Sequence, residues 1–332
     1  MNEILTNRST LLPPQGMLVA SRALAAARTS LIAFLIAKGA ELSGGAAHPI
    51  SYCNILFVGN LCASLVVGFW FGFGNILADL KGLKPKVLIG LFLNGGLATL
   101  LSALIFIGLQ YTSVTNAVLL GRLGPVLFAL VGAMILGKRI RSNEWFGFSL
   151  IAVGVIAIAL KTSDFQVNRG DLLILLSTVV FAASSLVNKL MVAKAATLRV
   201  VVFSRNFISS VIFFWIAMAL FGPEHFGDAF SGQLWIVMSV YSLIVIVLAQ
   251  FLWYASIERL DSRTIRRLTV LSPIFGITYA LLLNGERPSG IQVVTLFVIM
   301  LGVFVASLGK PKKTESKPEM AIQEPENTAS TP

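Results

Sequence analysis

The sequence predicts an all-α polytopic membrane protein, with ten transmembrane helices arranged as inverted 5+5 repeats. Three observations support this prediction. The 332 residues are 56% hydrophobic and only 12% charged, which is about half the charged fraction of an ordinary soluble domain. Ten apolar stretches have the length that crosses a bilayer, roughly 17–25 residues. The second half of the chain also repeats the pattern of the first.

The ten apolar stretches follow one another with short connections, so no room remains for a soluble domain. In chain order, we expect helices over residues 24–40, 50–74, 87–109, 113–136, 144–161, 171–192, 200–221, 234–257, 264–284 and 289–308. The first stretch has the shortest uninterrupted apolar part, because Arg22 and Arg28 confine it to about Thr29–Ala40.

The two ends of the chain are polar. We expect residues 1–18 to form an N-terminal cytoplasmic segment. The Pro-, Glu-, Lys- and Thr-rich residues 309–332 should be a disordered cytoplasmic tail.

Basic residues alternate between the loops in a way that indicates orientation. If the N-terminus is cytoplasmic, 21 of the 26 Lys and Arg residues fall on that side, Arg22 and Arg28 among them, and three fall on the other. Lys38 and Arg122 lie within predicted helices. Cytoplasmic loops carry the excess of basic residues, so both termini should be cytoplasmic and the membrane should be the plasma (inner) membrane. The net charge of +11 contains no basic run of five residues, and we expect no nucleic-acid partner.

An internal repeat appears when the chain is shifted by 148 positions, because residues 102–158 then align without a gap on 250–306. Five spans per repeat is an odd number, so the two copies must insert with opposite orientation, and such repeats place a substrate site near the bilayer midplane. Chance similarity between apolar helices is the alternative, which matched Pro and Gly positions disfavour. The matched residues are Leu120, Leu123, Pro125, Gly137, Arg139, Ile151, Gly154 and Val155 with Leu268, Leu271, Pro273, Gly285, Arg287, Ile299, Gly302 and Val303.

The repeated unit resembles a known family. The segments Ala103-Leu104-Ile105, Tyr111-Thr112-Ser113, Asn116-Ala117, Pro125-Val126-Leu127, Gly137-Lys138-Arg139 and Gly154-Val155 are similar to one EamA domain, and Phe251–Leu308 is similar to a second. The resemblance is to EamA-type transporters of the drug/metabolite transporter superfamily. It implies two EamA-like repeats, residues 19–161 and 169–308, that alternate access to the substrate. Lys138 departs from the family's usual Glu, which the second copy keeps as Glu286; we expect this loop change to leave the pathway untouched.

Arg122 is the leading candidate for substrate binding. It lies about nine residues into the predicted helix 113–136, where an ionised side chain costs at least ~2.5–3.5 kcal/mol. Its repeat mate is Val270, so the fold does not require an arginine there. The alternative is an arginine that bonds backbone carbonyls freed by Pro125. Pro125 and Pro273 lack an N–H and should either act as hinges or form tolerated packing kinks.

Other polar side chains within the predicted helices are further candidates for substrate contact. Buried amides need partners, so each could bind substrate or bond a neighbouring helix. Serines in such helices could serve packing alone, and a lysine could anchor a helix end. The remaining substrate-binding candidates are Lys38, Asn60, Asn94, Ser184, Asn188, Asn206, Gln250, Ser272 and Tyr279.

Motifs for catalysis, cofactors or metals are missing from the sequence. It contains no HExxH, GxSxG, Walker loop or CxxC, and no Asp or Glu near the middle of a predicted span. We therefore expect no enzyme activity, no catalytic residue, no cofactor and no metal site. The expected function is a secondary transporter for a small organic metabolite with an anionic group, with the lipid bilayer as its other partner. Two alternatives stay open: an exporter of amphipathic or aromatic compounds, and a non-transporting membrane scaffold or sensor. The sequence indicates no oligomeric state.

Overall fold

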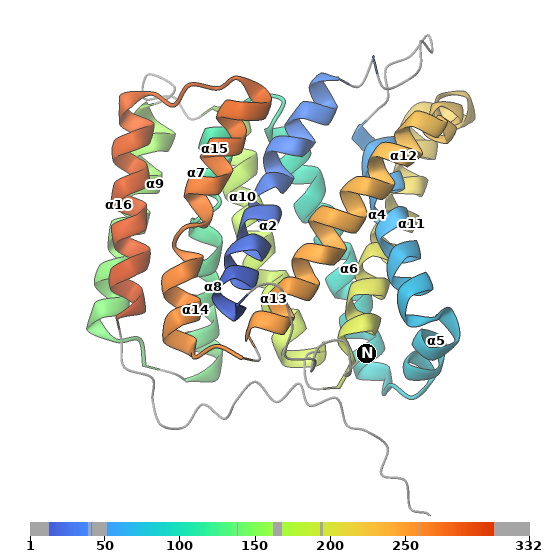
Figure 1. The fold of residues 1–332 in the computed structure, drawn as a ribbon, viewed down its shortest axis with the longest axis horizontal. Coiled ribbons are helices and arrows are strands. Elements are labelled where there is room, and N and C mark those ends of the chain that lie inside the picture. The colour runs from blue at the N-terminus through green and yellow to red at the C-terminus, as the bar shows by residue number, and fades with distance from the viewer. Residues whose placement is uncertain are drawn as a thin grey trace, which may run out of the picture.

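The computed structural model describes residues 13–38, 41, 52–137, 139–161, 168–192, 195–257 and 259–308. This part of the chain is all-helical and contains ten segments long and apolar enough to cross a membrane (Figure 1). The prediction of a ten-span integral membrane protein is confirmed. The tail 309–332, the first twelve residues and Lys138 lie outside the described residues.

The first five spans come from seven helices: α2 (Pro14–Ala37), α4 (Tyr52–Phe71), α5 (Phe73–Lys81), α6 (Pro85–Gly108), α7 (Val114–Leu120), α8 (Leu123–Leu136) and α9 (Ser142–Lys161). Together α7 and α8 form one broken span, and α5 is a short amphipathic helix after the second span. Gly72 ends α4 three residues before the predicted end, because its φ of 81° lies in the left-handed region that favours glycine.

The second five spans contain two π-helical stretches. Their elements are α10 (Arg169–Val187), η1 (Asn188–Val192), α11 (Leu198–Phe226), η2 (Gly227–Phe230), α12 (Gly232–Tyr241), η3 (Ser242–Leu248), α13 (Ala249–Ile257), α14 (Ser262–Thr269), α15 (Ser272–Asn284) and α16 (Gly290–Ser307). The π-helices are η1, at the end of the sixth span, and η3, within the eighth. Such stretches are rare and occur frequently at functional sites.

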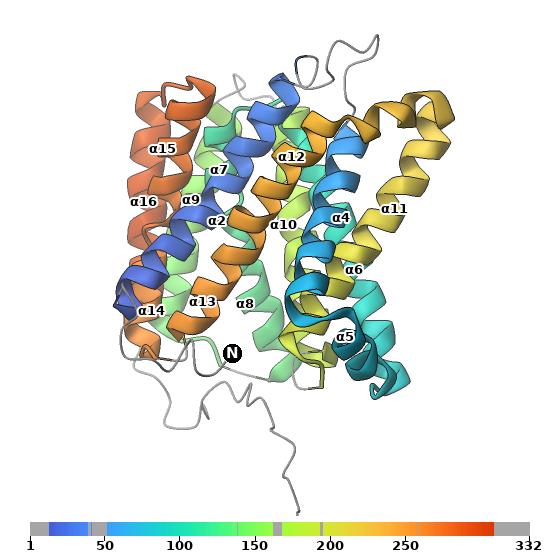
Figure 2. The same ribbon diagram turned by 45° about the vertical axis from the view of Figure 1, so that its right-hand side comes forward.

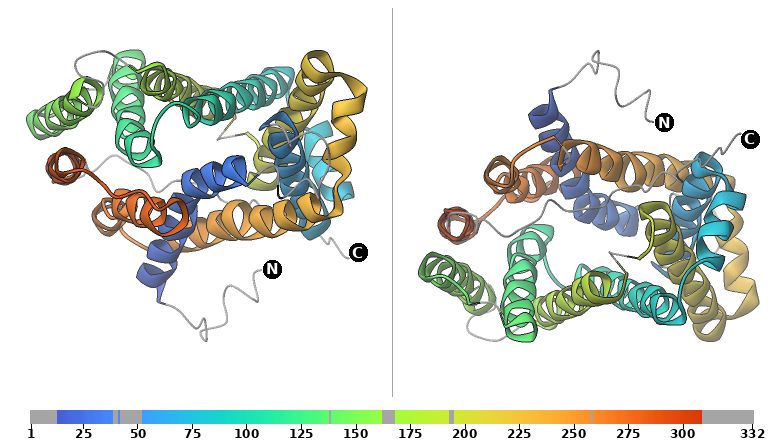
Figure 3. Two further views of the ribbon diagram at one scale, coloured as in Figure 1. Left: turned by 90° about the horizontal axis from the view of Figure 1, so that it is seen from above. Right: turned by 90° about the horizontal axis from the view of Figure 1, so that it is seen from below.

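We call the face where α2, α6 and α9 begin the lower face and the opposite one, where α7, α10 and α16 begin, the upper face, as Figure 1 shows them. Contacts between helices of the two repeats occur in symmetric pairs. α9 packs on α16 and α4 packs on α11, each against its own counterpart. The α6–α10 contact is matched by α13–α2, and the α8–α10 contact by α15–α2. This pairing is the arrangement expected of two inverted copies, and the helices form two rows when seen along the spans (Figure 3).

The first helix differs from its prediction. α2 begins at Pro14, ten residues before the predicted start, and places Arg22 and Arg28 inside a membrane-spanning helix. It runs obliquely alongside α13 (Figure 2). Two contacts make this possible: Arg22 stacks its guanidinium 3.9 Å from the Trp253 ring centre, and Arg28 donates to Ser102 Oγ at 3.4 Å. The assignment of these two arginines to the cytoplasmic side is therefore wrong.

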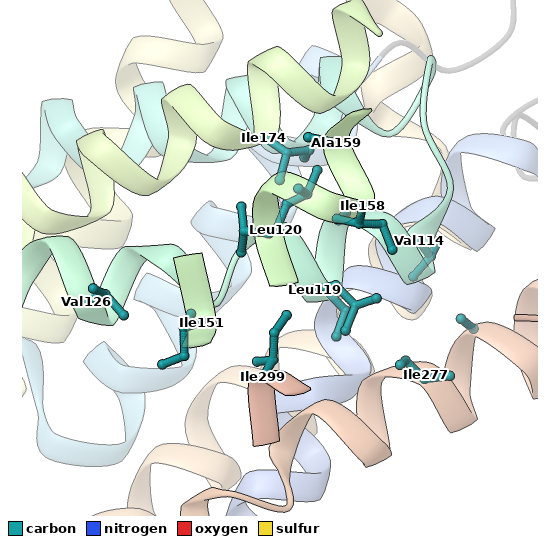
Figure 4. Close-up of a cluster of buried hydrophobic side chains, with 14 residues drawn as sticks. Val114, Leu119, Leu120, Val126, Ile151, Ile158, Ala159, Ile174, Ile277 and Ile299 are labelled. Atoms are coloured by element: carbon teal, nitrogen blue, oxygen red, sulfur yellow. The ribbon is translucent and has the colours of Figure 1, made fainter. Parts of the chain in front are cut away.

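The apolar residues divide between core and exterior. A buried cluster gathers Leu119 and Leu120 of α7 with Ile277 of α15 and Ile299 of α16, and so joins the two repeats (Figure 4). Large apolar side chains are also exposed along the outside, such as Met134 at 81%. Extended exposed apolar surface marks contact with lipid or other proteins, and here it lies on spanning helices.

Candidate functional site

Both candidate hinge prolines follow a break in a spanning helix. α7 gives way to α8 at Gly121 and Arg122, just before Pro125. α14 gives way to α15 at Val270 and Leu271, just before Pro273. The two breaks lie at corresponding places of the two repeats. Backbone hydrogen bonds are thus fewer at these points than in a continuous helix, which makes them the places where the spans can bend.

Arg122 occupies the first break, and part of its guanidinium serves the local backbone. Its own N–H turns to Leu119 O at 3.1 Å, so Val118 O loses its usual helical partner. The Nε of Arg122 donates to Val118 O at 3.3 Å instead. Arg122 thus bonds a freed carbonyl, as the predicted alternative has it, but this carbonyl is freed by the helix break and not by Pro125, whose i−4 carbonyl, Gly121 O, accepts from Gly124 N. Arg122 is half-buried and lies close enough to Arg22 for like-charge repulsion.

A second arginine, Arg28, lies at a small polar centre between α2, α4, α6 and α12. Its guanidinium donates to Ser102 Oγ and is within hydrogen-bonding reach of the Tyr241 hydroxyl. Arg28, Asn60 and Tyr241 line one hollow of about 20 Å³, which is room for about one water molecule. Arg28 lies 14 residues along α2, about 21 Å from its lower end at 1.5 Å per residue. This places the hollow well inside the membrane.

Of the polar residues that line this hollow, the sequence predicted Asn60 as a substrate-binding candidate and missed Arg28 and Tyr241. Asn60 was selected as a buried amide, and its Nδ2 donates to Leu56 O at 2.7 Å. The signal for Arg28 was present, because extending the first helix by ten residues would have put it mid-span. Tyr241 precedes the π-helix η3, and nothing in the local sequence predicts that helix type.

The other candidates lie in three different settings. Asn94 of α6 accepts a hydrogen bond from Ser184 Oγ of α10 at 2.7 Å, and both are buried. Asn206 donates to Val202 O within its own helix at 2.8 Å. Asn188 begins η1, and its Oδ1 is buried with no hydrogen-bond partner among the described residues.

The last four candidates stand apart from the Arg28 hollow. Gln250 lines another hollow, of about 10 Å³, with Arg199. Lys38 forms an ion pair with Glu41 at 2.6 Å, at the upper end of α2, and its side chain is 43% exposed. Two further candidates lie on α15: Ser272 is buried at its first position, and Tyr279 is half-buried.

A polar network joins the two repeats at the upper face, and sequence reasoning missed it. Glu286, in the loop between α15 and α16, reaches the first turn of α7. Its carboxylate accepts from Val114 N at 2.7 Å, and from Thr115 N and Thr115 Oγ1 at 2.9 Å each. A carboxylate at a helix N-terminus satisfies donors that have no intrahelical partner. The position that departs from the EamA pattern thus has, in the second copy, a structural task between the repeats.

Two more contacts extend this network. Thr112 donates to Asp171, which is buried at the start of α10. Gln292 of α16 donates its amide to Asn116 Oδ1 of α7 at 2.7 Å. Loops and helix starts of both repeats are therefore tied together at the upper face by hydrogen bonds of charged or buried groups.

Ten apolar spans, symmetric inter-repeat pairing, broken helices and internal polar groups define an integral membrane protein of the inverted-repeat transporter class. The chain belongs to the EamA-like transporter family, whose model matches residues 23–160 and 168–308. The two matches correspond to the two repeats. This is a family of transporters and not of enzymes, as the sequence predicted. Membership in it also does not favour a non-transporting scaffold or sensor.

Known relatives agree with this assignment. The chain is 28% identical over 296 residues to an uncharacterized transporter of Synechocystis sp., covering 85% of this chain and 82% of the relative. It is 23% identical to a probable amino-acid metabolite efflux pump of Salmonella typhimurium, with 68% and 79% covered. A solved crystal structure matches with a TM-score of 0.53 at 22% identity, covering 87% of this chain and 97% of that chain. That likeness concerns the fold alone.

Proposed function

We propose that the chain is a secondary transporter that moves a small organic metabolite with an anionic group, by alternating access between its two repeats. One observation carries the proposal: Arg28 and Arg122 lie within spans, and no described carboxylate forms an ion pair with either. The ion pairs found in the described residues, Lys38–Glu41 and Asp79–Arg199, lie near helix ends. A charge inside the membrane is costly unless paired, and an anionic substrate would supply the missing partner.

The relatives support the substrate class. Two of them are named probable amino-acid metabolite efflux pumps, from Salmonella typhimurium and Escherichia coli. Amino acids and many of their metabolites carry a carboxylate, the group that a guanidinium binds with two parallel hydrogen bonds. Arg122 keeps its two terminal nitrogens for such a partner, since only Nε is used by Val118 O.

Transport requires that the repeats move. The hollow beside Arg28 has room for about one water molecule, so a metabolite can enter only when the helices separate. The upper face is held by the Glu286 network. We propose that α7–α8 and α14–α15 bend at the breaks before Pro125 and Pro273, the two hinge candidates, as one face closes and the other opens.

The orientation is part of the proposal. The sequence assigns 19 Lys and Arg residues to the lower side once Arg22 and Arg28 are placed in α2, and four to the upper side once Lys38 is counted at the upper end of α2. The excess of basic residues indicates that the lower face is cytoplasmic, with both termini on that side of a plasma (inner) membrane. The Glu286 network then holds the extracytoplasmic face of the transporter closed.

The test is uptake into proteoliposomes that contain the purified full chain, with leucine and other amino acids as labelled probes. We expect Arg122→Ala to lower the initial rate at least tenfold and Arg122→Lys to retain part of it, because lysine keeps the charge but lacks the planar fork. Arg287→Gln is the matched control, since this arginine is exposed in the upper loop. Wild-type rates in Arg122→Ala for every transported probe would refute the pairing.

An exporter of amphipathic or aromatic compounds is the second candidate. The observation that favours it is the other hollow, where the rings of Phe71 and Phe251 stack with centres 5.5 Å apart beside Gln250. This candidate predicts that Arg122→Ala leaves transport unchanged. Phe251→Ala would then lower the flux of aromatic probes, which gives the two candidates opposite outcomes.

A further inference from the structure

The hollow beside Arg28 has one charged group and an otherwise apolar wall. Besides Arg28, Asn60 and Tyr241, it is lined by aliphatic and aromatic side chains that include Leu35, Ile55 and Phe106. Ile55 and Phe106 are almost fully buried, at 1% and 0% exposure. A site of this composition holds a ligand with one ionised end and an apolar body.

The partners of Arg28 make it a receptor for an anion. In the described residues its guanidinium donates to the Ser102 hydroxyl and lies within reach of the Tyr241 hydroxyl, and no carboxylate pairs with it. A hydroxyl can donate its proton as well as accept one, and Tyr241 lines the hollow with Arg28. A carboxylate that arrives there would meet a guanidinium and the Tyr241 hydroxyl. Such charge-assisted bonds are roughly twice as strong as neutral ones.

We infer that the Arg28 hollow is the anion subsite of the transporter, and that it takes an aliphatic monocarboxylate. The carboxylate binds Arg28 and Tyr241, Ser102 orients the guanidinium of Arg28, and the apolar body lies against Leu35, Ile55 and Phe106. This inference rests on the proposed transport function and deepens it. It also places the two arginines at different steps: Arg28 holds the carboxylate in this hollow, and Arg122 pairs with it at the helix break as the repeats move.

The single positive charge of the hollow excludes dicarboxylates and phosphate dianions as its ligands. A dicarboxylate would place its second negative group among apolar side chains, at a large desolvation cost. A phosphate dianion would need a second cation, and Arg28 is the only basic residue that lines this hollow in the described part of the chain. The single guanidinium thus matches a single negative charge.

The π-helix η3 forms part of the wall of the subsite, because its Ile246 lines the hollow. Tyr241 precedes η3, whose Ser242 Oγ donates to Gly59 O of α4 at 2.9 Å. Gly59 leaves room for Met238, because an added Cβ would lie 2.4 Å from Met238 Cε, the end of a flexible side chain. Met238 also lines the hollow. The ligand volume would come from a shift of Met238 and of η3, which also packs on α2.

The test measures binding and transport separately on the purified full chain. Binding is read from the rise in melting temperature with added ligand, since a ligand that binds the folded state stabilises it. The probes are isovalerate, isoamyl alcohol as its neutral counterpart, succinate and inorganic phosphate. We expect isovalerate to stabilise the wild type, and isoamyl alcohol, succinate and phosphate to bind at least tenfold more weakly.

The variants are Arg28→Gln, Arg28→Lys, Tyr241→Phe and, as the matched control, Arg287→Gln, because Arg287 is exposed in the upper loop. We expect isovalerate to bind at least tenfold more weakly to Arg28→Gln and a few-fold more weakly to Tyr241→Phe and Arg28→Lys, while Arg287→Gln retains binding. Tyr241→Phe removes one hydroxyl only, so it reports on the subsite even if Arg28→Gln does not fold. Equal isovalerate affinity in the wild type and in the folded Arg28 and Tyr241 variants would overturn the inference, as would tighter binding of succinate or phosphate.

The failure of the subsite and the failure of the proposed function look different. Absence of isovalerate stabilisation, with leucine still transported by the wild type, overturns the subsite alone. Isovalerate binding that depends on Arg28, with no labelled compound moved by the wild type, supports the subsite and contradicts the transport function. Flux of labelled isovalerate that Arg28→Gln leaves unchanged also overturns the subsite.

Discussion

Replacing Glu286 by glutamine should loosen the upper face, because one carboxylate there holds three donors of the other repeat. One carboxylate oxygen accepts from Val114 N and the other accepts from Thr115 N and Thr115 Oγ1. Glutamine keeps one oxygen and turns an NH₂ group toward the remaining donors. At least one hydrogen bond is lost and the others lose their charge, at about 1.5–3 kcal/mol for a bond to a charged group. The charge at the start of α7 contributes a further ~0.3–1 kcal/mol.

The expected total is about 2–4 kcal/mol in favour of an open upper face. Every 1.4 kcal/mol is tenfold in an equilibrium, so a buried reporter there should react at least tenfold faster. The reporter is Val114→Cys in a background without native cysteines, since Val114 is 2% exposed and its backbone N–H is retained. The assay is the labelling rate with a membrane-impermeant maleimide. Arg287→Gln is the control for local charge. An unchanged labelling rate in Glu286→Gln would refute the role of Glu286 in holding the upper face closed.

Two further predictions concern packing and pH. Gly147→Ala should destabilise the α9–α16 contact by about 1–3 kcal/mol relative to Gly96→Ala, because its Cβ would lie 2.4 Å from Gly302 O, whereas Gly96 faces open space. Both gain similar helix propensity, so equal melting temperatures in detergent would contradict the close approach. Hydrogen bonds from Arg199 lower the pKa of Asp79 below its ordinary value. The stability from this pair is therefore full above the ordinary pKa of aspartate and is lost as the pH falls toward the folded value. Asp79→Asn should remove this acid-side loss, about 1 kcal/mol for a partly exposed pair, in melting curves taken across pH.

Patterns that depend on neighbours along the chain predicted most of the fold. Apolar runs of spanning length give the ten helices, because a bilayer requires about twenty apolar residues whatever they pack against. The shifted match of Pro125 with Pro273 predicts two kinked spans, and both breaks occur. The position of each break follows from the same local chemistry, since proline lacks the backbone N–H that a continuous helix needs.

Features that depend on distant partners were not predicted. In the sequence, Arg28 stands directly before an apolar run, which suggests a position at the membrane surface. Its contacts come from other spans: it donates to the Ser102 hydroxyl and lies within reach of the Tyr241 hydroxyl. The π-helix after Tyr241 has no signature in its sequence, which is apolar after Ser242. The candidate amides were recognised as buried, yet whether an amide bonds its own helix, as Asn206 does, or another helix, as Asn94 does, is a matter of packing.

The two repeats cap corresponding helices with different groups, and this makes the two faces of the symmetric fold unequal. At α7, Ser113 Oγ accepts from Asn116 N, and Glu286 adds its bonds from the other repeat. At α14, the repeat mate of Ser113 is Asp261, which accepts from Thr264 N and Thr264 Oγ1 within the same helix.

The repeat mate of Glu286 is Lys138, and a lysine has no acceptor for helix donors. Opening the upper face must therefore break the Glu286 bonds between the repeats, whereas the two bonds that Asp261 accepts from Thr264 lie within one helix. Under the proposed transport function, this difference would favour a closed upper face at rest. An anionic substrate that reaches Arg28 from the lower side would then supply the free energy that opens it.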